Sequence, residues 1–135
     1  MPDFEIIEHP SDLKIRVFGK TKEELFLNAL KGMAKLQSSA AEEETKTKRK
    51  IKIESFDPST LLVDFLSQAL YLSQINNEVY FFAKIKKLLD NQIEADLFGR
   101  KIERFTYDIK GVTYYDLNIK QEADGQWTAT LLFDI

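Results

Sequence analysis

The sequence contains no cysteine and only one histidine, His9. Without cysteine the chain cannot form disulfides, thiolate zinc sites or iron–sulfur clusters, and it has no cysteine nucleophile. The absence of cysteine does not identify the cellular compartment. A single histidine without cysteine also argues against a structural zinc site. These absences remove the common classes of thiol-based and zinc-based chemistry.

Glycine and long apolar runs are also scarce. The five glycines form no glycine-rich phosphate loop or nucleophile elbow, and the chain has no metalloprotease motif, so the sequence predicts no catalytic machinery. No window reaches the roughly 18 apolar residues that a membrane helix needs, and the N-terminus lacks the basic and apolar parts of a signal peptide. We therefore expect a cytoplasmic protein without a membrane partner.

Net charge is small: 19 Lys and Arg against 22 Asp and Glu give −3. The protein as a whole should not attract polyanions, so any RNA contact would be indirect or local. The hydrophobic fraction of 44% and the charged fraction of 30% are ordinary for a folded protein. At 135 residues, the chain is predicted to form one domain spanning 1–135.

The first half of the chain alternates strand and helix patterns. Apolar residues alternate over 4–6 and 13–17, which predicts two strands. Thr21 and Glu24 have capping-box spacing before a helix with Leu25, Ala29 and Met33 on one face. Residues 38–48 lack an apolar period and indicate a solvated loop. A strand over 49–56 and a broadly apolar helix over 61–75 follow, the latter ended by two asparagines.

The second half of the chain has strand patterns over 78–89 and 93–99. After an irregular stretch, a hairpin is predicted within 111–135, and its turn contains Asp124-Gly125. Two helices among hairpin-linked strands predict an α+β protein. We expect a single domain with two main helices packed on a mixed, mostly antiparallel sheet of about seven strands.

Four groups near the two ends of the chain could form a site. His9 and Asp12 lie in the connection between the first two strands, and the chain ends on Asp134 and the carboxylate of Ile135. If the end of the last strand lies beside Asp12, three carboxylates meet, which requires a cation or a shared proton. From the residues alone, a turn role for Asp12 and a solvated strand end for Asp134 are the simpler interpretation.

Two basic runs offer a second candidate. Residues 46–52 (KTKRKIK) and 84–87 (KIKK) could meet phosphates locally. Lysines that protect a strand edge against unwanted pairing are the favoured interpretation of both runs. In the segment GVTYYDL, one of Tyr114 and Tyr115 should point to the core and the other outward.

Four segments, EHPSDLKIRVFGKTKEELFLNAL, LLVDFLSQALYL, GVTYYDLNI and the terminal LLFDI, resemble the archease family in order and spacing over nearly the whole chain. The chain differs from the family pattern at Pro10 and Ser11, at Tyr115, and in a shorter segment over 97–111. Archeases are non-catalytic partners of the GTP-dependent tRNA-splicing RNA ligase, so the resemblance implies a protein cofactor that activates this ligase rather than an enzyme.

The resemblance also implies a divalent cation site at Asp12, Asp134 and Ile135. Its metal would most simply be Ca²⁺, with Mg²⁺ or Mn²⁺ as other options, because the oxygen ligands are hard. Two alternatives stay open at this point. The chain could be a metal-dependent hydrolase of RNA or phosphoesters with His9 as base, or a folding and assembly module that offers a strand edge to clients.

Overall fold

The computed structural model describes residues 2–8, 12–38, 45–114 and 119–135. His9, Pro10, Ser11 and Tyr115 lie outside the described residues. The elements in chain order are β1 (Phe4–Glu8), β2 (Asp12–Gly19), α1 (Lys22–Gln37), β3 (Thr47–Glu54), α2 (Pro58–Asn76), β4 (Glu78–Leu89), β5 (Gln92–Lys101), β6 (Gly111–Tyr114), β7 (Lys120–Gln121) and β8 (Trp127–Asp134).

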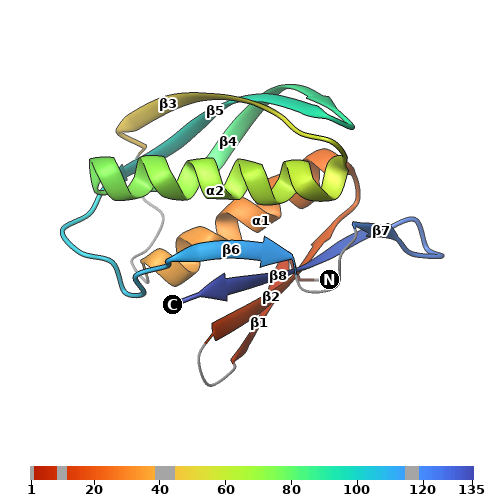
Figure 1. Ribbon diagram of the computed structural model, residues 1–135, viewed down its shortest axis with the longest axis horizontal. Coiled ribbons are helices and arrows are strands. Elements are labelled where there is room, and N and C mark those ends of the chain that lie inside the picture. The colour runs from red at the N-terminus through yellow and green to blue at the C-terminus, as the bar shows by residue number, and fades with distance from the viewer. Residues whose placement is uncertain (1, 9–11, 39–44, 115–118) are drawn as a thin grey trace.

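The helices form a layer between two sheets (Figure 1). One sheet runs in the order β1-β2-β8-β6, with β7 also paired to β8, and the other in the order β3-β5-β4. Every strand pair between described residues is antiparallel. The predicted α+β class and the two helices are confirmed, and the strands number eight in two sheets.

Helix α1 follows the predicted pattern. The Thr21 hydroxyl caps its N-terminus by accepting the N–H of Glu24 at 3.1 Å, which satisfies one of the N–H groups that a helix start leaves unpaired. Leu25, Ala29 and Met33 are fully buried, as expected from their spacing. This helix packs against β2 on one side and β4 on the other.

Helix α2 is buried on a wide arc. It begins after Asp57, whose side chain accepts the N–H of Thr60 at 2.7 Å, and ends at Asn77, which adopts a left-handed conformation with φ of 53°. Its apolar residues contact both sheets, through β6 below and β3, β4 and β5 above. A helix between two sheets needs apolar residues on both sides, which explains its broad hydrophobic pattern.

The strand boundaries differ slightly from the expected ones. Strand β3 begins at Thr47, so the predicted loop over 38–48 is too long by two residues at its end, while residues 39–44 lie outside the described part. The predicted hairpin turn at Asp124-Gly125 is confirmed, because Gly125 has φ of 88° and its N–H donates to the Glu122 carbonyl. Neither described helix has the length and apolarity needed to cross a bilayer.

Candidate functional site

Asp12 and Asp134 lie directly opposite each other on neighbouring strands. In the antiparallel pair β2–β8 the register couples Asp12 with Asp134 and Leu13 with Phe133. Directly paired residues project to the same face of a sheet, with Cβ atoms about 4.5 to 5.5 Å apart. Two carboxylates that are 122 positions apart in the chain therefore share one small region of the sheet.

These carboxylates lie on the face turned away from the helices. Leu13 and Phe133 are buried in the core, so alternation along the strands directs Asp12 and Asp134 to the opposite face. Asp134 is exposed and Asp12 is half-buried. The site is thus open to solvent on one side and supported by the core on the other.

The end of the chain is held against the same sheet. The side chain of Ile135 is half-buried and packs against the core, and the Asp134 carbonyl accepts the N–H of Lys110 at 2.6 Å. Figure 1 shows the C-terminus beside the start of β2. These contacts fix the main chain of the last two residues next to Asp12.

This arrangement places carboxylates of like charge close together. Like charges directly opposite each other on paired strands repel, and the Ile135 carboxylate adds a third negative group. The described residues contain no group of three or more His, Cys, Asp or Glu side chains able to hold a metal ion. The predicted site has only two such side chains, since its third ligand is a main-chain carboxylate, and its occupancy stays a prediction.

Of the other residues that the sequence analysis singled out, the structure describes only some. His9, Pro10, Ser11 and Tyr115 lie outside the described residues, whereas Tyr114 is 36% exposed on β6. Hydrogen bonds anchor the irregular stretch after β5: for example, the N–H of Thr106 donates to the Gln37 carbonyl, and the Gln74 amide donates to the Ile109 carbonyl. Ile109 is fully buried.

The basic run over 46–52 contains one residue whose role the sequence analysis missed. Arg49 donates two hydrogen bonds of 2.9 Å to the Glu78 carboxylate, which is completely buried. Arg49 has the same strand phase as Ile51 and Ile53, and this phase was the available signal that it faces the core side. Arg49 and Glu78 form a structural ion pair. Lys48, Lys50 and Lys52 project from the opposite face.

Comparisons with known proteins agree along the whole chain. The sequence model described as "Archease protein family (MTH1598/TM1083)" matches residues 4–135. A relative named protein archease from Methanosarcina barkeri is 34% identical, covering 98% of this chain and 95% of its own. A protein archease from Thermoplasma volcanium is 36% identical, covering 98% of both chains.

Two solved structures share the fold. The solution structure of protein 1598 from Methanobacterium thermoautotrophicum superposes with a TM-score of 0.81 at 26% identity and covers 100% of both chains. A crystal structure described as an archease and possible chaperone from Thermotoga maritima has a TM-score of 0.67 at 18% identity. It covers 96% of this chain and 94% of its own.

Proposed function

This chain belongs to the archease family, and from that membership we propose that it is a non-catalytic protein cofactor of the GTP-dependent tRNA-splicing RNA ligase. It would promote guanylylation of the ligase and its repeated turnover. The single observation that carries the proposal is the family match over residues 4–135, which includes Asp12, Asp134 and Ile135.

The proposal includes a divalent cation held by Asp12, Asp134 and Ile135. Cross-strand pairing of Asp12 with Asp134 supports this assignment, as does the position of Ile135 against the core. The donor set consists of carboxylate oxygens, which are the ligands of calcium-sized cations, with water completing the shell. So few protein ligands predict a modest affinity.

Each residue has a distinct part in this site. Asp12 contributes from the start of β2 and Asp134 from the end of β8, while the half-buried Ile135 side chain holds the chain end against the core. A bound cation would supply the positive charge that offsets the repulsion among the carboxylates. The two strand ends would then form a stable surface that contacts the ligase without taking part in proton transfer.

The proposed role is tested with the ligase from the same source. We expect the wild-type chain to raise the guanylylation rate and the number of RNA joining turnovers. Asp12→Asn and Asp134→Asn should lose most of this activation, because each removes one negative charge from the cation site. Asp90→Asn is a matched control, since Asp90 lies in the β4–β5 turn and pairs only with Lys22 among described residues.

Thermal unfolding of the same proteins separates loss of activation from loss of fold. Full activation by folded Asp12→Asn and Asp134→Asn proteins would rule out the cation-dependent form of the proposal. Hydrolysis of RNA or phosphoesters by the isolated chain would favour the hydrolase, and suppression of aggregation of unrelated clients without any effect on the ligase would favour the chaperone.

Use of the Ile135 carboxylate as a ligand gives a separate prediction. Appending a short peptide after Ile135 converts this carboxylate into an amide and moves the terminal negative charge away from the site. We expect weaker binding of Ca²⁺, measured by isothermal calorimetry, because ligand charge sets the affinity of oxygen sites. An extended protein that binds Ca²⁺ as tightly as the original would exclude the terminal carboxylate from the site.

A further inference from the structure

The outer face of the three-stranded sheet gathers the two basic runs of the sequence. Strand register places Lys50 opposite Asp96 and Asp96 opposite Lys84, and the next row joins Lys52, Glu94 and Lys87. The register shift between Ile85 and Lys87 leaves Lys86 out of the pairing, and its side chain lies 3.1 Å from Asp96 on the same face. We call this surface the lysine face, and its six lysines are Lys48, Lys50, Lys52, Lys84, Lys86 and Lys87.

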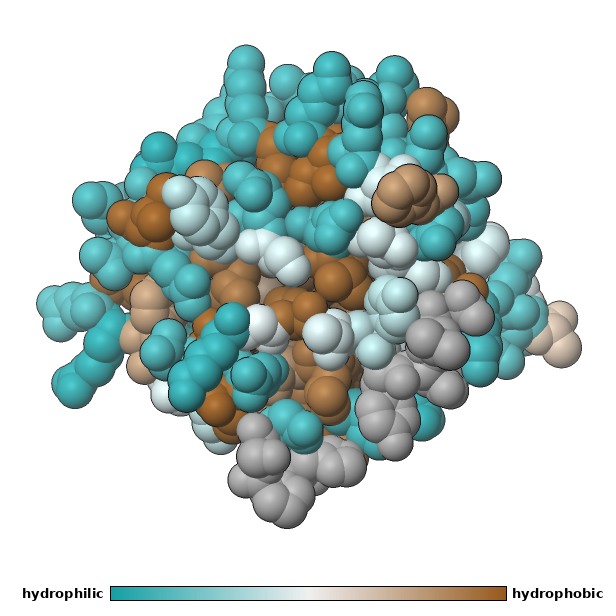
Figure 2. Space-filling model, viewed as in Figure 1, coloured by the Kyte–Doolittle hydropathy of each residue, from teal (hydrophilic) through white to brown (hydrophobic). Residues whose placement is uncertain are grey.

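The lysine face is directed away from the helices. Ile51 on β3 and Ala83 on β4 alternate with these lysines and are buried, so the lysines occupy the solvent side. Hydrophilic residues project from the top of the molecule in Figure 2, where Figure 1 places β3, β5 and β4. The lysines therefore belong to the sheet surface and not only to its edges.

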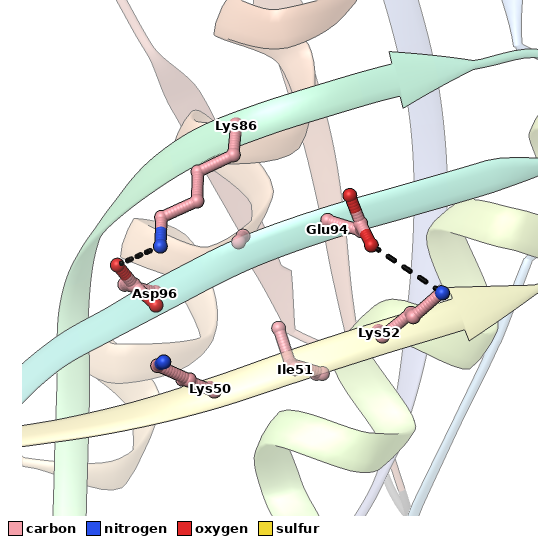
Figure 3. A pocket seen from close by; sticks show the side chains of 7 residues that line it. Lys50, Ile51, Lys52, Lys86, Glu94 and Asp96 are labelled. Carbon is pink, nitrogen blue, oxygen red and sulfur yellow. Dashed lines mark ion pairs between the residues drawn. The ribbon is translucent and has the colours of Figure 1, made fainter.

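Two carboxylates, Asp96 and Glu94, pair with some of these lysines but do not balance the positive charge of the whole face. Asp96 is buried beneath the lysines, 3.1 Å from Lys86 and 3.6 Å from Lys48, and its hydrogen bond with Lys86 lowers the pKa of Asp96. Glu94 lies 3.5 Å from Lys52. Figure 3 shows the Lys86–Asp96 and Lys52–Glu94 ion pairs in a pocket that Lys50 also lines.

Positive charge remains in excess on this face. Lys50, Lys84 and Lys87 take part in no ion pair with any residue that the structure describes. Lysines at alternate positions of a strand repeat about every 6.6 Å, so they form a row of donors along the sheet. Such a row suits a ligand that carries regularly spaced negative charges, even though the whole protein is slightly acidic.

An aromatic pair continues the same face. Register places Phe82 opposite Phe98 and Phe98 opposite Lys48, and the two rings are 6.1 Å apart between centroids. Lys48 lies 6.0 Å from the centre of the Phe98 ring, and Phe82 is 51% exposed. A surface that served only solubility would have no reason to expose this ring beside its lysines.

We infer that the lysine face binds single-stranded nucleic acid. Lys50, Lys84 and Lys87 contact the phosphates, and a base stacks on the exposed ring of Phe82, as on other sheet surfaces that bind single strands. A duplex fits less well because its bases are already stacked on one another. The inference goes beyond the proposed ligase role and does not depend on it, since binding is measured on this chain alone.

Fluorescence anisotropy with a labelled oligouridine of about 12 nucleotides, a span typical of such surfaces, tests the inference. We expect saturable binding that weakens with salt, with a log–log slope of about −2 for three phosphate contacts. The double variant Lys50→Glu/Lys84→Glu should lower the affinity at least tenfold. Phe82→Leu keeps the charge and the apolar character, so its expected loss of about tenfold reports stacking.

The matched control is Lys20→Glu/Arg104→Glu, which makes the same charge change at two exposed residues outside the lysine face, and it should leave the affinity unchanged. Oligodeoxyuridine should bind comparably and a duplex more weakly.

Three results would overturn the inference: no binding at low salt, equal losses in the control, or duplex binding as strong as single-strand binding with no effect of Phe82→Leu. Tighter binding to phosphatidylserine vesicles with the same lysine dependence would assign the face to a membrane instead.

Discussion

Glu78 is the most deeply buried charge described in the protein, and its neighbours account for its burial. Its carboxylate accepts two hydrogen bonds from Arg49 and one of 2.7 Å from the Tyr80 hydroxyl. The hydrogen bonds from Arg49 are the main reason why the pKa of Glu78 is lowered from 4.5. Burial and the bond to Glu78 in turn raise the pKa of Tyr80 to about 12.

A lowered pKa in the folded state predicts how Glu78 stabilises the protein across pH. Folding favours the ionised form of Glu78. Its contribution to the free energy of unfolding is therefore complete above the ordinary pKa of 4.5, and it is lost as the pH falls through the lower pKa of the folded state. We expect Glu78→Gln to lower the free energy of unfolding by about 2 kcal/mol at neutral pH. The difference from wild type should shrink below pH 4.5.

Urea unfolding followed by the fluorescence of Trp127, the single tryptophan, measures this difference at each pH. Glu103→Gln is the control, because Glu103 is exposed and has no ion pair among the described residues. A deficit of Glu78→Gln that stayed constant from neutral to acid pH would show that Glu78 stabilises by shape rather than by charge.

Residue-level prediction from the sequence succeeded where local periodicity determines burial, and it failed where the contacting residues are far apart in the chain. Leu25, Ala29 and Met33 were identified as core residues by their spacing, and they are buried. The pairing of Asp12 with Asp134 depends on which strands become neighbours, and no local pattern encodes that choice. From the residues alone their proximity was one of two open interpretations, and the resemblance to a family favoured it.

Among the elements, β5 contains a glycine that the packing requires. A Cβ atom added to Gly99 would lie 1.8 Å from the Val79 carbonyl oxygen and 2.9 Å from the Tyr80 Cα. Both atoms belong to the backbone of β4, next to the register shift between Tyr80 and Phe82. The close approach of the strands at this shift leaves no room for a side chain.

We therefore expect Gly99→Ala to destabilise the fold by about 3 kcal/mol, because the β4 backbone has to move. Gly111→Ala is the matched control: a Cβ atom there would meet nothing within 4 Å, so its effect should be neutral or slightly stabilising. Differential scanning calorimetry of both variants provides the comparison. Equal midpoints would mean that β4 and β5 do not approach each other as closely as described.

The elements themselves were largely predictable, whereas their partition into two sheets was not. Alternation identified the strands, and the capping box of Thr21 and Glu24 identified the start of α1. The second helix was predicted to begin at residue 61, whereas α2 begins at Pro58. The broad apolar arc of α2 indicated a central helix, which is consistent with cover on both sides. We expected a single sheet. Hairpin connections determine only which consecutive strands are neighbours, so they do not show whether the strands form one sheet or two. In the structure, α1 and α2 separate β3, β4 and β5 from the other strands.

At the scale of the whole molecule, the helix layer keeps the two candidate sites apart. Asp12 and Asp134 belong to the sheet β1-β2-β8-β6, and the lysine face belongs to β3-β5-β4 (Figure 1). Each site lies on the outer side of its own sheet, so the two sheets and the helices stand between them. A helix with its side chains is about 10 Å thick, which already equals the Debye length at about 0.1 M salt.

This separation predicts that the two sites act independently. Asp12→Asn should weaken Ca²⁺ binding and leave the affinity for oligouridine unchanged, while Lys50→Glu/Lys84→Glu should do the opposite, because screening by salt and distance removes direct coupling. A double-mutant cycle that combines these changes should give additive free energies for both ligands within about 0.5 kcal/mol. Calorimetry for the cation and anisotropy for the oligonucleotide, each at about 0.1 M salt, supply the four corners of the cycle. A coupling well above that limit would mean that the helix layer transmits a conformational change between the sheets, and the two surfaces would then have to be treated as one regulated unit.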